Sequence, residues 1–256
     1  MTLSIALRGD TARFPGNTLP ALRSALRAGV DLVKIDVHLT SDGYPVLVDE
    51  RVVTVPGSPP RQVGDLTLAE LAAARDDVER RVPTLMEVLA EFCGRDASPL
   101  LIDATAPEAA LAADTALREH GFGDQALFTG PVETLRALRA RSPGVRLMLA
   151  WDQPGAPPEE TARSLRPVFL GTHYTLLNRE TVGEMHRHGY GVVAWTVNEF
   201  PEMARLIGMG VDALATERLD DLVSLTTGRA QGAPRETEQG AARRTVQGTS
   251  PTPGPA

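Results

Sequence analysis

The 256-residue sequence contains a single lysine, Lys34, so nearly all of its permanent positive charge comes from arginine. It also contains a single cysteine, Cys93, which excludes an intramolecular disulfide and favours a buried apolar role within a helical pattern. No segment approaches the ~20 consecutive apolar residues of a membrane span, and the N-terminus has no signal-peptide pattern. We therefore expect a cytoplasmic protein without a membrane span.

A concentration of positive charge is also missing. The formal net charge is −7 at pH 7, and the sequence contains no basic stripe. Nucleic acid is therefore not an expected partner, although single phosphate groups could still bind locally. The sequence is 42% hydrophobic, which is enough for a sizeable core. Length alone permits either one large domain or two ordinary ones.

Short apolar runs of the kind that form strands alternate with helical patterns along most of the chain. Helix start and stop signals separate them, among them Thr18, Gly29 and Gly210. This alternation predicts an α/β fold, a single (β/α)8 TIM barrel. The eight expected strands are at residues 3–7, 30–37, 99–104, 126–130, 145–151, 168–173, 191–197 and 211–216.

Two segments depart from the alternation. Residues 40–44 are too few to connect parallel strands, and they contain the turn signal Asp42-Gly43, so we expect a β-hairpin inserted after the second strand. From about Thr226 the sequence loses its apolar periodicity. We expect the barrel to occupy residues 1–226 and a disordered tail to occupy residues 227–256.

Lys34 lies two residues before Asp36 in an expected strand, so both side chains share one face. Near the carboxyl end of a barrel strand, that face is the mouth, where barrels place their sites. An ammonium group at this position can form an ion pair with Asp36. A lysine that reaches solvent and a Schiff-base amine are the alternatives.

Several local patterns, in their order and spacing, resemble those of one family. They are Ala6-Leu7-Arg8-Gly9, Pro15-Gly16-Asn17-Thr18-Leu19, Lys34-Ile35-Asp36-Val37, Pro45-Val46-Leu47-Val48-Asp49-Glu50, Val82-Pro83-Thr84-Leu85, Leu101-Ile102-Asp103, Trp195-Thr196-Val197-Asn198, and Gly210-Val211-Asp212 leading to Thr216-Glu217. On these residues the sequence resembles the glycerophosphodiester phosphodiesterases, which belong to the phospholipase-C-like phosphodiesterase barrels. The resemblance covers roughly residues 3–226.

The resemblance implies hydrolysis of glycerophosphodiesters, the deacylated products of phospholipids, to glycerol 3-phosphate and an alcohol. Active members hold Mg²⁺ or Ca²⁺ on three carboxylates, use two histidines as general acid and base, and hold the phosphate with an arginine. In this sequence the two histidine positions are Leu7 and Asp49. Asp36 and Asp103 remain as metal-ligand positions, and the third is Lys34. We therefore predict that Lys34 forms an ion-pair cluster with Asp36 and Asp103 and takes the place of the metal ion.

We therefore expect a catalytically impaired relative with no cofactor, or with Mg²⁺ or Ca²⁺ if the metal site survives. Its expected ligand is a phosphodiester or another phosphate-bearing small molecule, held by Arg8 with Trp195 and His173 as further contacts. Two alternatives remain: Arg8 could form a purely structural ion pair, and Trp195 could serve only in packing.

Three other functions also stay open. One is an active phosphodiesterase whose relocated acid and base are Arg8 with Asp49, His38 or His173, although His38 also fits a polar residue at the rim. Another is a non-catalytic interaction protein whose partner the sequence does not specify. The third is an unrelated barrel enzyme that uses Lys34 covalently.

Overall fold

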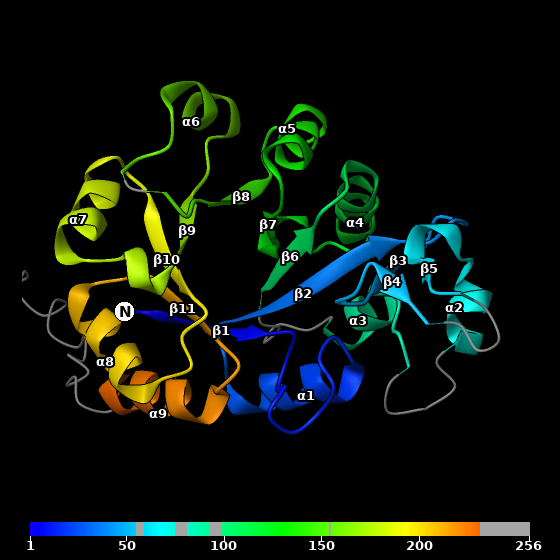
Figure 1. The fold of residues 1–256 in the computed structure, drawn as a ribbon, viewed down its shortest axis with the longest axis horizontal. Coiled ribbons are helices and arrows are strands. Elements are labelled where there is room, and N and C mark those ends of the chain that lie inside the picture. The colour runs from blue at the N-terminus through cyan, green and yellow to red at the C-terminus, as the bar shows by residue number, and fades with distance from the viewer. Residues whose placement is uncertain (55–58, 75–80, 93–98, 154, 231–256) are drawn as a thin grey trace, which may run out of the picture.

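A computed structural model describes residues 1–54, 59–74, 81–92, 99–153 and 155–230 of the chain. Within these ranges, eight parallel strands form a barrel and the helices lie around its outside (Figure 1). The barrel strands are β1 (Leu3–Leu7), β2 (Leu32–Leu39), β6 (Leu100–Ala104), β7 (Leu127–Thr129), β8 (Arg146–Ala150), β9 (Phe169–His173), β10 (Gly191–Trp195) and β11 (Ala213–Thr216).

The strand order β1-β11-β10-β9-β8-β7-β6-β2 closes on itself because β1 also pairs with β2, with Ile5 opposite Leu32. The pairing of β1 with β11 brings the first and last strands together, with Ala6 opposite Thr216. The predicted (β/α)8 TIM barrel is confirmed.

Helices follow the barrel strands, as the alternation predicted. Thr18 caps the first of them by accepting a hydrogen bond from the Ala21 amide at 3.4 Å, and Gly29 ends it in the left-handed conformation. None of the helices within the described residues is both long and apolar enough to cross a membrane. The helices are α1 (Leu19–Ala28), α2 (Leu68–Ala74), α3 (Leu85–Phe92), α4 (Pro107–Glu119), α5 (Val132–Arg141), α6 (Glu159–Leu165), α7 (Arg179–Arg187), α8 (Phe200–Met209) and α9 (Leu219–Ala230).

The last helix, α9, continues past the expected end of the barrel at residue 226 and ends at Ala230. The remainder of the expected tail, residues 231–256, lies outside the described residues, and so does Cys93.

The inserted hairpin is also confirmed. Strand β3 (Pro45–Leu47) runs antiparallel to β2, with Leu47 opposite Val37. A second antiparallel pair, β4 (Val52–Val53) and β5 (Arg61–Gln62), follows it and leads to α2, so that the insertion stands to one side of the barrel (Figure 1). A separate hydrophobic cluster holds the insertion together, formed by Val46, Val48, Val53, Val63, Leu66, Leu71 and Val82.

Two aromatic side chains shape the barrel interior, and each lies over a glycine of the neighbouring strand. A Cβ atom on Gly171 of β9 would lie 2.3 Å from Cζ3 of Trp195, and a Cβ atom on Gly191 of β10 would lie 2.5 Å from the Phe169 ring. Because real Cβ atoms do not approach this closely, each position requires glycine. The two rings therefore occupy the space that a side chain at Gly171 or Gly191 would need.

Candidate functional site at the barrel mouth

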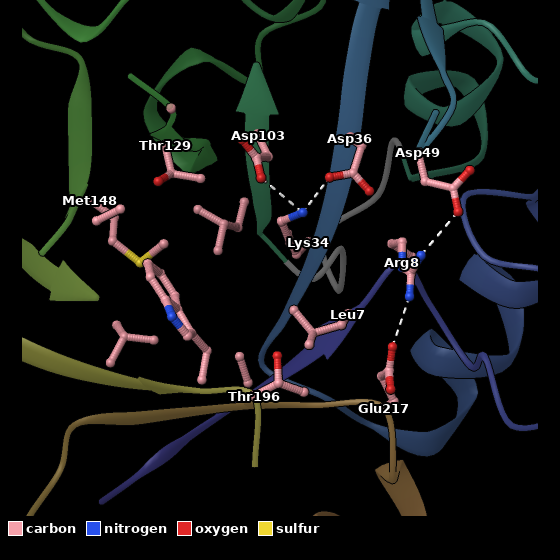
Figure 2. A pocket seen from close by; sticks show the side chains of 16 residues that line it. Leu7, Arg8, Lys34, Asp36, Asp49, Asp103, Thr129, Met148, Thr196 and Glu217 are labelled. Carbon is pink, nitrogen blue, oxygen red and sulfur yellow. Dashed lines mark hydrogen bonds and ion pairs between the residues drawn. The ribbon is translucent and has the colours of Figure 1, made fainter. Parts of the chain in front are cut away.

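The carboxyl ends of the barrel strands surround a pocket of about 500 Å³, which we call the mouth. One part of its lining is apolar and includes Leu101, Met148, Val193 and Trp195. The other part is charged and comes from β2, from β6, from the hairpin, and from the residues directly after β1 and β11 (Figure 2). The charged lining residues are Arg8, Lys34, Asp36, Asp49, Asp103 and Glu217.

Lys34 forms the predicted ion-pair cluster. Its Nζ donates a hydrogen bond to Oδ1 of Asp36 and lies 2.9 Å from Oδ2 of Asp103 (Figure 2). The parallel pairing of β2 with β6 places Asp36 directly opposite Asp103, and Lys34 shares the face of Asp36 because strand side chains alternate. The ammonium group thus lies between two carboxylates from neighbouring strands.

The environment of Lys34 favours its charged form. Burial alone would lower the pKa of the ammonium, but the charges of Asp103 and Asp36 and their hydrogen bonds outweigh burial and raise that pKa above its ordinary value. A Schiff-base lysine must reach its neutral form. The interaction with two carboxylates therefore disfavours the covalent alternative.

Asp36 is held from its other side by Asn17. The Asn17 amide group donates to Oδ2 of Asp36 at 2.9 Å, and the Asp36 backbone amide donates to Oδ1 of Asn17 at 3.1 Å. Both carboxylate oxygens of Asp36 are therefore engaged, one by Lys34 and one by Asn17.

Arg8 forms a second ion-pair group, separate from that of Lys34 (Figure 2). Its Nη1 donates to Oδ2 of Asp49 at 2.9 Å, and its Nη2 donates to Oε1 of Glu217 at 2.7 Å. The backbone of Arg8 is left-handed, with φ 61°, which costs on the order of 1–3 kcal/mol in a residue other than glycine. The surrounding structure offsets this backbone cost, and the two ion pairs fix the position of the guanidinium.

Glu217 is a site residue that the sequence reasoning did not single out. Asn198 positions it, since its side-chain amide donates to Oε2 of Glu217 at 3.1 Å and its Oδ1 accepts the Glu217 backbone amide at 3.0 Å. The sequence feature that could have indicated Glu217 is its position directly after the last barrel strand. Closure of the barrel pairs β11 with β1 and so brings Glu217 beside Arg8. Such strand ends carry the functional groups of barrels.

The candidate residues named from the sequence divide into two groups. Arg8, Asp36, Asp49, Asp103 and Trp195 all line the mouth, together with Leu7 and Lys34.

His38 and His173 do not line the mouth. The His173 side chain is exposed, with Nδ1 2.8 Å from the Thr175 hydroxyl. Among the described residues, those that line the mouth therefore include no histidine.

His38 instead lines a second pocket of about 450 Å³, which we call the side cavity. Burial, and then the charge of Arg51, lower the pKa of the His38 imidazole below its ordinary value. The polar and charged side chains that line it include those of His38, Ser41, Arg51, Gln62, Thr105 and Glu108.

The mouth residues do not fit a divalent cation. Mg²⁺ and Ca²⁺ need several oxygen ligands, but Asp36 has both oxygens engaged and Asp103 faces the Lys34 ammonium. Within the described ranges, no group of three or more His, Cys, Asp or Glu side chains is placed to hold a metal ion. An ammonium group lies where the two carboxylates would meet such an ion.

Comparison with known proteins identifies relatives of this chain. The sequence pattern of the glycerophosphoryl diester phosphodiesterase family matches residues 8–221. The chain is 26% identical over 239 residues to the glycerophosphodiester phosphodiesterase of Caldanaerobacter subterraneus subsp. tengcongensis, an alignment that covers 88% of this chain and 97% of that protein.

A second relative is the putative glycerophosphodiester phosphodiesterase YhdW of Bacillus subtilis, 25% identical over 234 residues, with 86% of this chain and 96% of that protein covered. Among solved structures, a phosphodiesterase of Oleispira antarctica in complex with the product sn-glycerol-3-phosphate has the same fold. Its TM-score is 0.78 at 23% identity, with 89% of this chain and 97% of that chain covered.

Proposed function

This chain belongs to the glycerophosphoryl diester phosphodiesterase family, and on that premise we propose that it is a catalytically impaired member that binds a phosphate-bearing small molecule at the mouth. The observation that carries the proposal is the Lys34 ammonium between Asp36 and Asp103. In this proposal, Lys34 is a covalently attached cation in the position that the family resemblance gives to a metal.

A lysine replaces only part of what a divalent cation does. Its single positive charge relieves the repulsion between Asp36 and Asp103. However, an ammonium group cannot coordinate a phosphoryl oxygen or lower the pKa of a bound water, which are the catalytic contributions of a metal ion. The cluster therefore stabilises the barrel mouth without supplying that chemistry.

The groups that would transfer protons in the family's hydrolysis reaction are also missing from the described residues of the mouth. The two positions to which the family resemblance assigns histidine are Leu7, which cannot exchange a proton, and Asp49, which is paired with Arg8 at 2.9 Å. General acid–base catalysis typically contributes about 10²–10⁴-fold to a rate. The loss of both histidines supports weak or absent hydrolysis.

Ligand binding is supported by what remains in the mouth. The Oleispira antarctica relative was solved with a phosphate-bearing product, and Arg8 offers a planar guanidinium that can exchange Asp49 or Glu217 for a phosphate. The apolar wall with Met148 and Trp195 would contact the remainder of the ligand.

A thermal unfolding experiment tests the replacement of the metal. We expect Mg²⁺ or Ca²⁺ to leave the Tm of the wild-type protein unchanged. Lys34→Glu restores a third carboxylate, and we expect its Tm to rise by about 5 °C or more at a cation concentration about a hundredfold above Kd. Lys34→Met is the matched control, since it removes the ammonium without adding a ligand. Tight metal binding by the wild type that disappears in Asp36→Asn would overturn the proposal.

A hydrolysis assay tests the impairment separately. With glycerophosphoethanolamine and Mg²⁺, Ca²⁺ or Mn²⁺, we expect turnover near the uncatalysed background. Robust metal-dependent turnover that Asp36→Ala abolishes would contradict this expectation. An active enzyme with relocated acid and base would instead give a bell-shaped pH profile that Asp49→Asn removes.

A further inference from the structure

The side cavity contains the guanidinium group of Arg51, which forms no ion pair with a carboxylate of the residues that the structure describes. The Arg51 backbone is fixed, because its carbonyl accepts a hydrogen bond from the Val63 amide at 2.8 Å. Its Nε donates to the Thr105 hydroxyl at 3.3 Å, and among the described residues its side chain forms no ion pair. The two nitrogens at the end of the fork therefore have hydrogens to donate to a ligand.

Other hydrogen-bonding groups line the same cavity. His38 lies on β2 two residues after Asp36, and Thr105 lies two residues after Asp103, directly past the end of the paired strand β6. The side cavity thus lies next to the carboxylate cluster, about 7 Å further along β2. Ser41 and Gln62 contribute a hydroxyl and an amide from the hairpin side.

One acidic group opposes these donors. Glu108, in the first turn of α4, also lines the cavity. Its carboxylate lowers the affinity for any anion, but it faces several donors and one full positive charge, so the lining as a whole still suits an oxyanion.

We propose that the side cavity is a second binding site for the phosphate group of a small molecule, with Arg51 as its anchor and with His38 and Thr105 as further donors. A guanidinium fork binds two phosphate oxygens at once, and the imidazole and hydroxyl groups suit the remaining oxygens of a tetrahedral anion. The volume of about 450 Å³ leaves room for a small group attached to the phosphate.

The site is distinct from the mouth in composition. In the mouth, a phosphate must displace Asp49 or Glu217 from Arg8. In the side cavity, no carboxylate from the described part of the chain has to leave Arg51. A free phosphate therefore binds the side cavity in preference to the mouth.

Calorimetric titration with inorganic phosphate at low ionic strength tests the proposal. We expect the wild-type protein to bind, and Arg51→Gln to bind about tenfold more weakly or worse, because a charge-assisted hydrogen bond is lost. Arg61→Gln is the matched control: Arg61 lies nearby on β5, is paired with Glu70 and does not line the cavity, so its affinity should equal that of the wild type.

A second variant keeps the test independent of any local damage caused by Arg51→Gln. Glu108→Gln removes the opposing carboxylate, and we expect phosphate to bind about twofold to fivefold more tightly. Unchanged affinity in both Arg51→Gln and Glu108→Gln would overturn the proposal. A loss of binding in Arg8→Gln, with Arg51→Gln unaffected, would also overturn it, because the phosphate would then be at the mouth. The metal experiment on Lys34 examines the mouth alone, so the two proposals can fail separately.

Discussion

The mouth and the side cavity lie next to each other along β2 and β6, and they differ in what surrounds their cations. In the mouth, Arg8 and Lys34 each contact two carboxylates from different parts of the chain. In the side cavity, Arg51 contacts a hydroxyl group and forms no ion pair among the described residues.

This difference separates two uses of positive charge. A cation that neighbouring carboxylates neutralise holds strands together and binds an anion more weakly, because the ligand must first compete with those carboxylates. A cation without such partners contributes little to the fold and remains available for an anion. The number of arginine and lysine side chains around a pocket is therefore a poor guide to anion binding.

The largest expected effect comes from rebuilding the mouth. The combined variant Leu7→His, Lys34→Glu and Asp49→His restores the three positions to which the family resemblance assigns two histidines and a metal-binding carboxylate. We expect metal-dependent hydrolysis of glycerophosphoethanolamine to rise by about 10²-fold or more, since general acid–base chemistry alone supplies that much. The rate is measured as released alcohol with and without Ca²⁺.

The control for this gain is the same variant with Asp36→Ala, which removes a carboxylate that the restored metal site needs. That protein should return to the wild-type rate. Equal rates in the rebuilt and the wild-type proteins would mean that positions beyond these three limit the reaction.

The next prediction compares the contributions of Lys34 and Arg51 to the free energy of unfolding. Lys34→Met leaves Asp36 and Asp103 facing each other without a counter-charge, and because the cluster is only partly buried we expect a loss of about 1–3 kcal/mol. Arg51→Met should change the free energy of unfolding by less than about 0.5 kcal/mol, since its side chain is exposed, forms no ion pair with the described residues and donates one long hydrogen bond, to Thr105. Urea unfolding of both variants measures the difference, and equal losses would remove the distinction between the two regions.

The smallest effect concerns the loop that supports Arg8. Asp10 is almost fully buried and accepts hydrogen bonds from Ser24 at 2.6 Å and from Arg13 at 2.8 Å. Burial alone would raise the pKa of the Asp10 carboxyl, but these hydrogen bonds and the Arg13 charge lower it below its ordinary value.

Because the folded pKa of Asp10 is lowered, its contribution to stability is present above the unfolded pKa and is lost as the pH falls through the folded pKa. Asp10→Asn should reduce stability at neutral pH by about 1 kcal/mol and remove this part of the acid-side decline. Unfolding curves between neutral pH and pH 3 measure it, with Asp124→Asn as the control at an exposed position.

The Lys34 cluster could be predicted from the sequence because it depends on two regular features. Side chains alternate along a strand, which puts Lys34 and Asp36 on one face, and parallel neighbours in a barrel align their carboxyl ends, which brings Asp103 beside them. Neither feature depends on the details of a loop.

Arg51 and Glu217 were not predicted, for different reasons. Arg51 lies in the irregular connection between β3 and β4, where no periodicity indicates the direction of a side chain. Glu217 is far from Arg8 in the sequence, and only closure of the barrel between β1 and β11 joins them. His38 shares the face of Asp36 as expected, but it lines a different cavity because β2 extends beyond the mouth alongside the hairpin.

The aromatic ring over Gly171 gives this protein a built-in optical probe. The chain has two tryptophans, and the other one, Trp151, donates a hydrogen bond to the Gly155 carbonyl outside the mouth. A Trp151→Phe variant would leave all indole fluorescence at the mouth, where the emission of Trp195 depends on the polarity of whatever lies against it. Compound collections could then be screened for the natural ligand before anyone knows its identity.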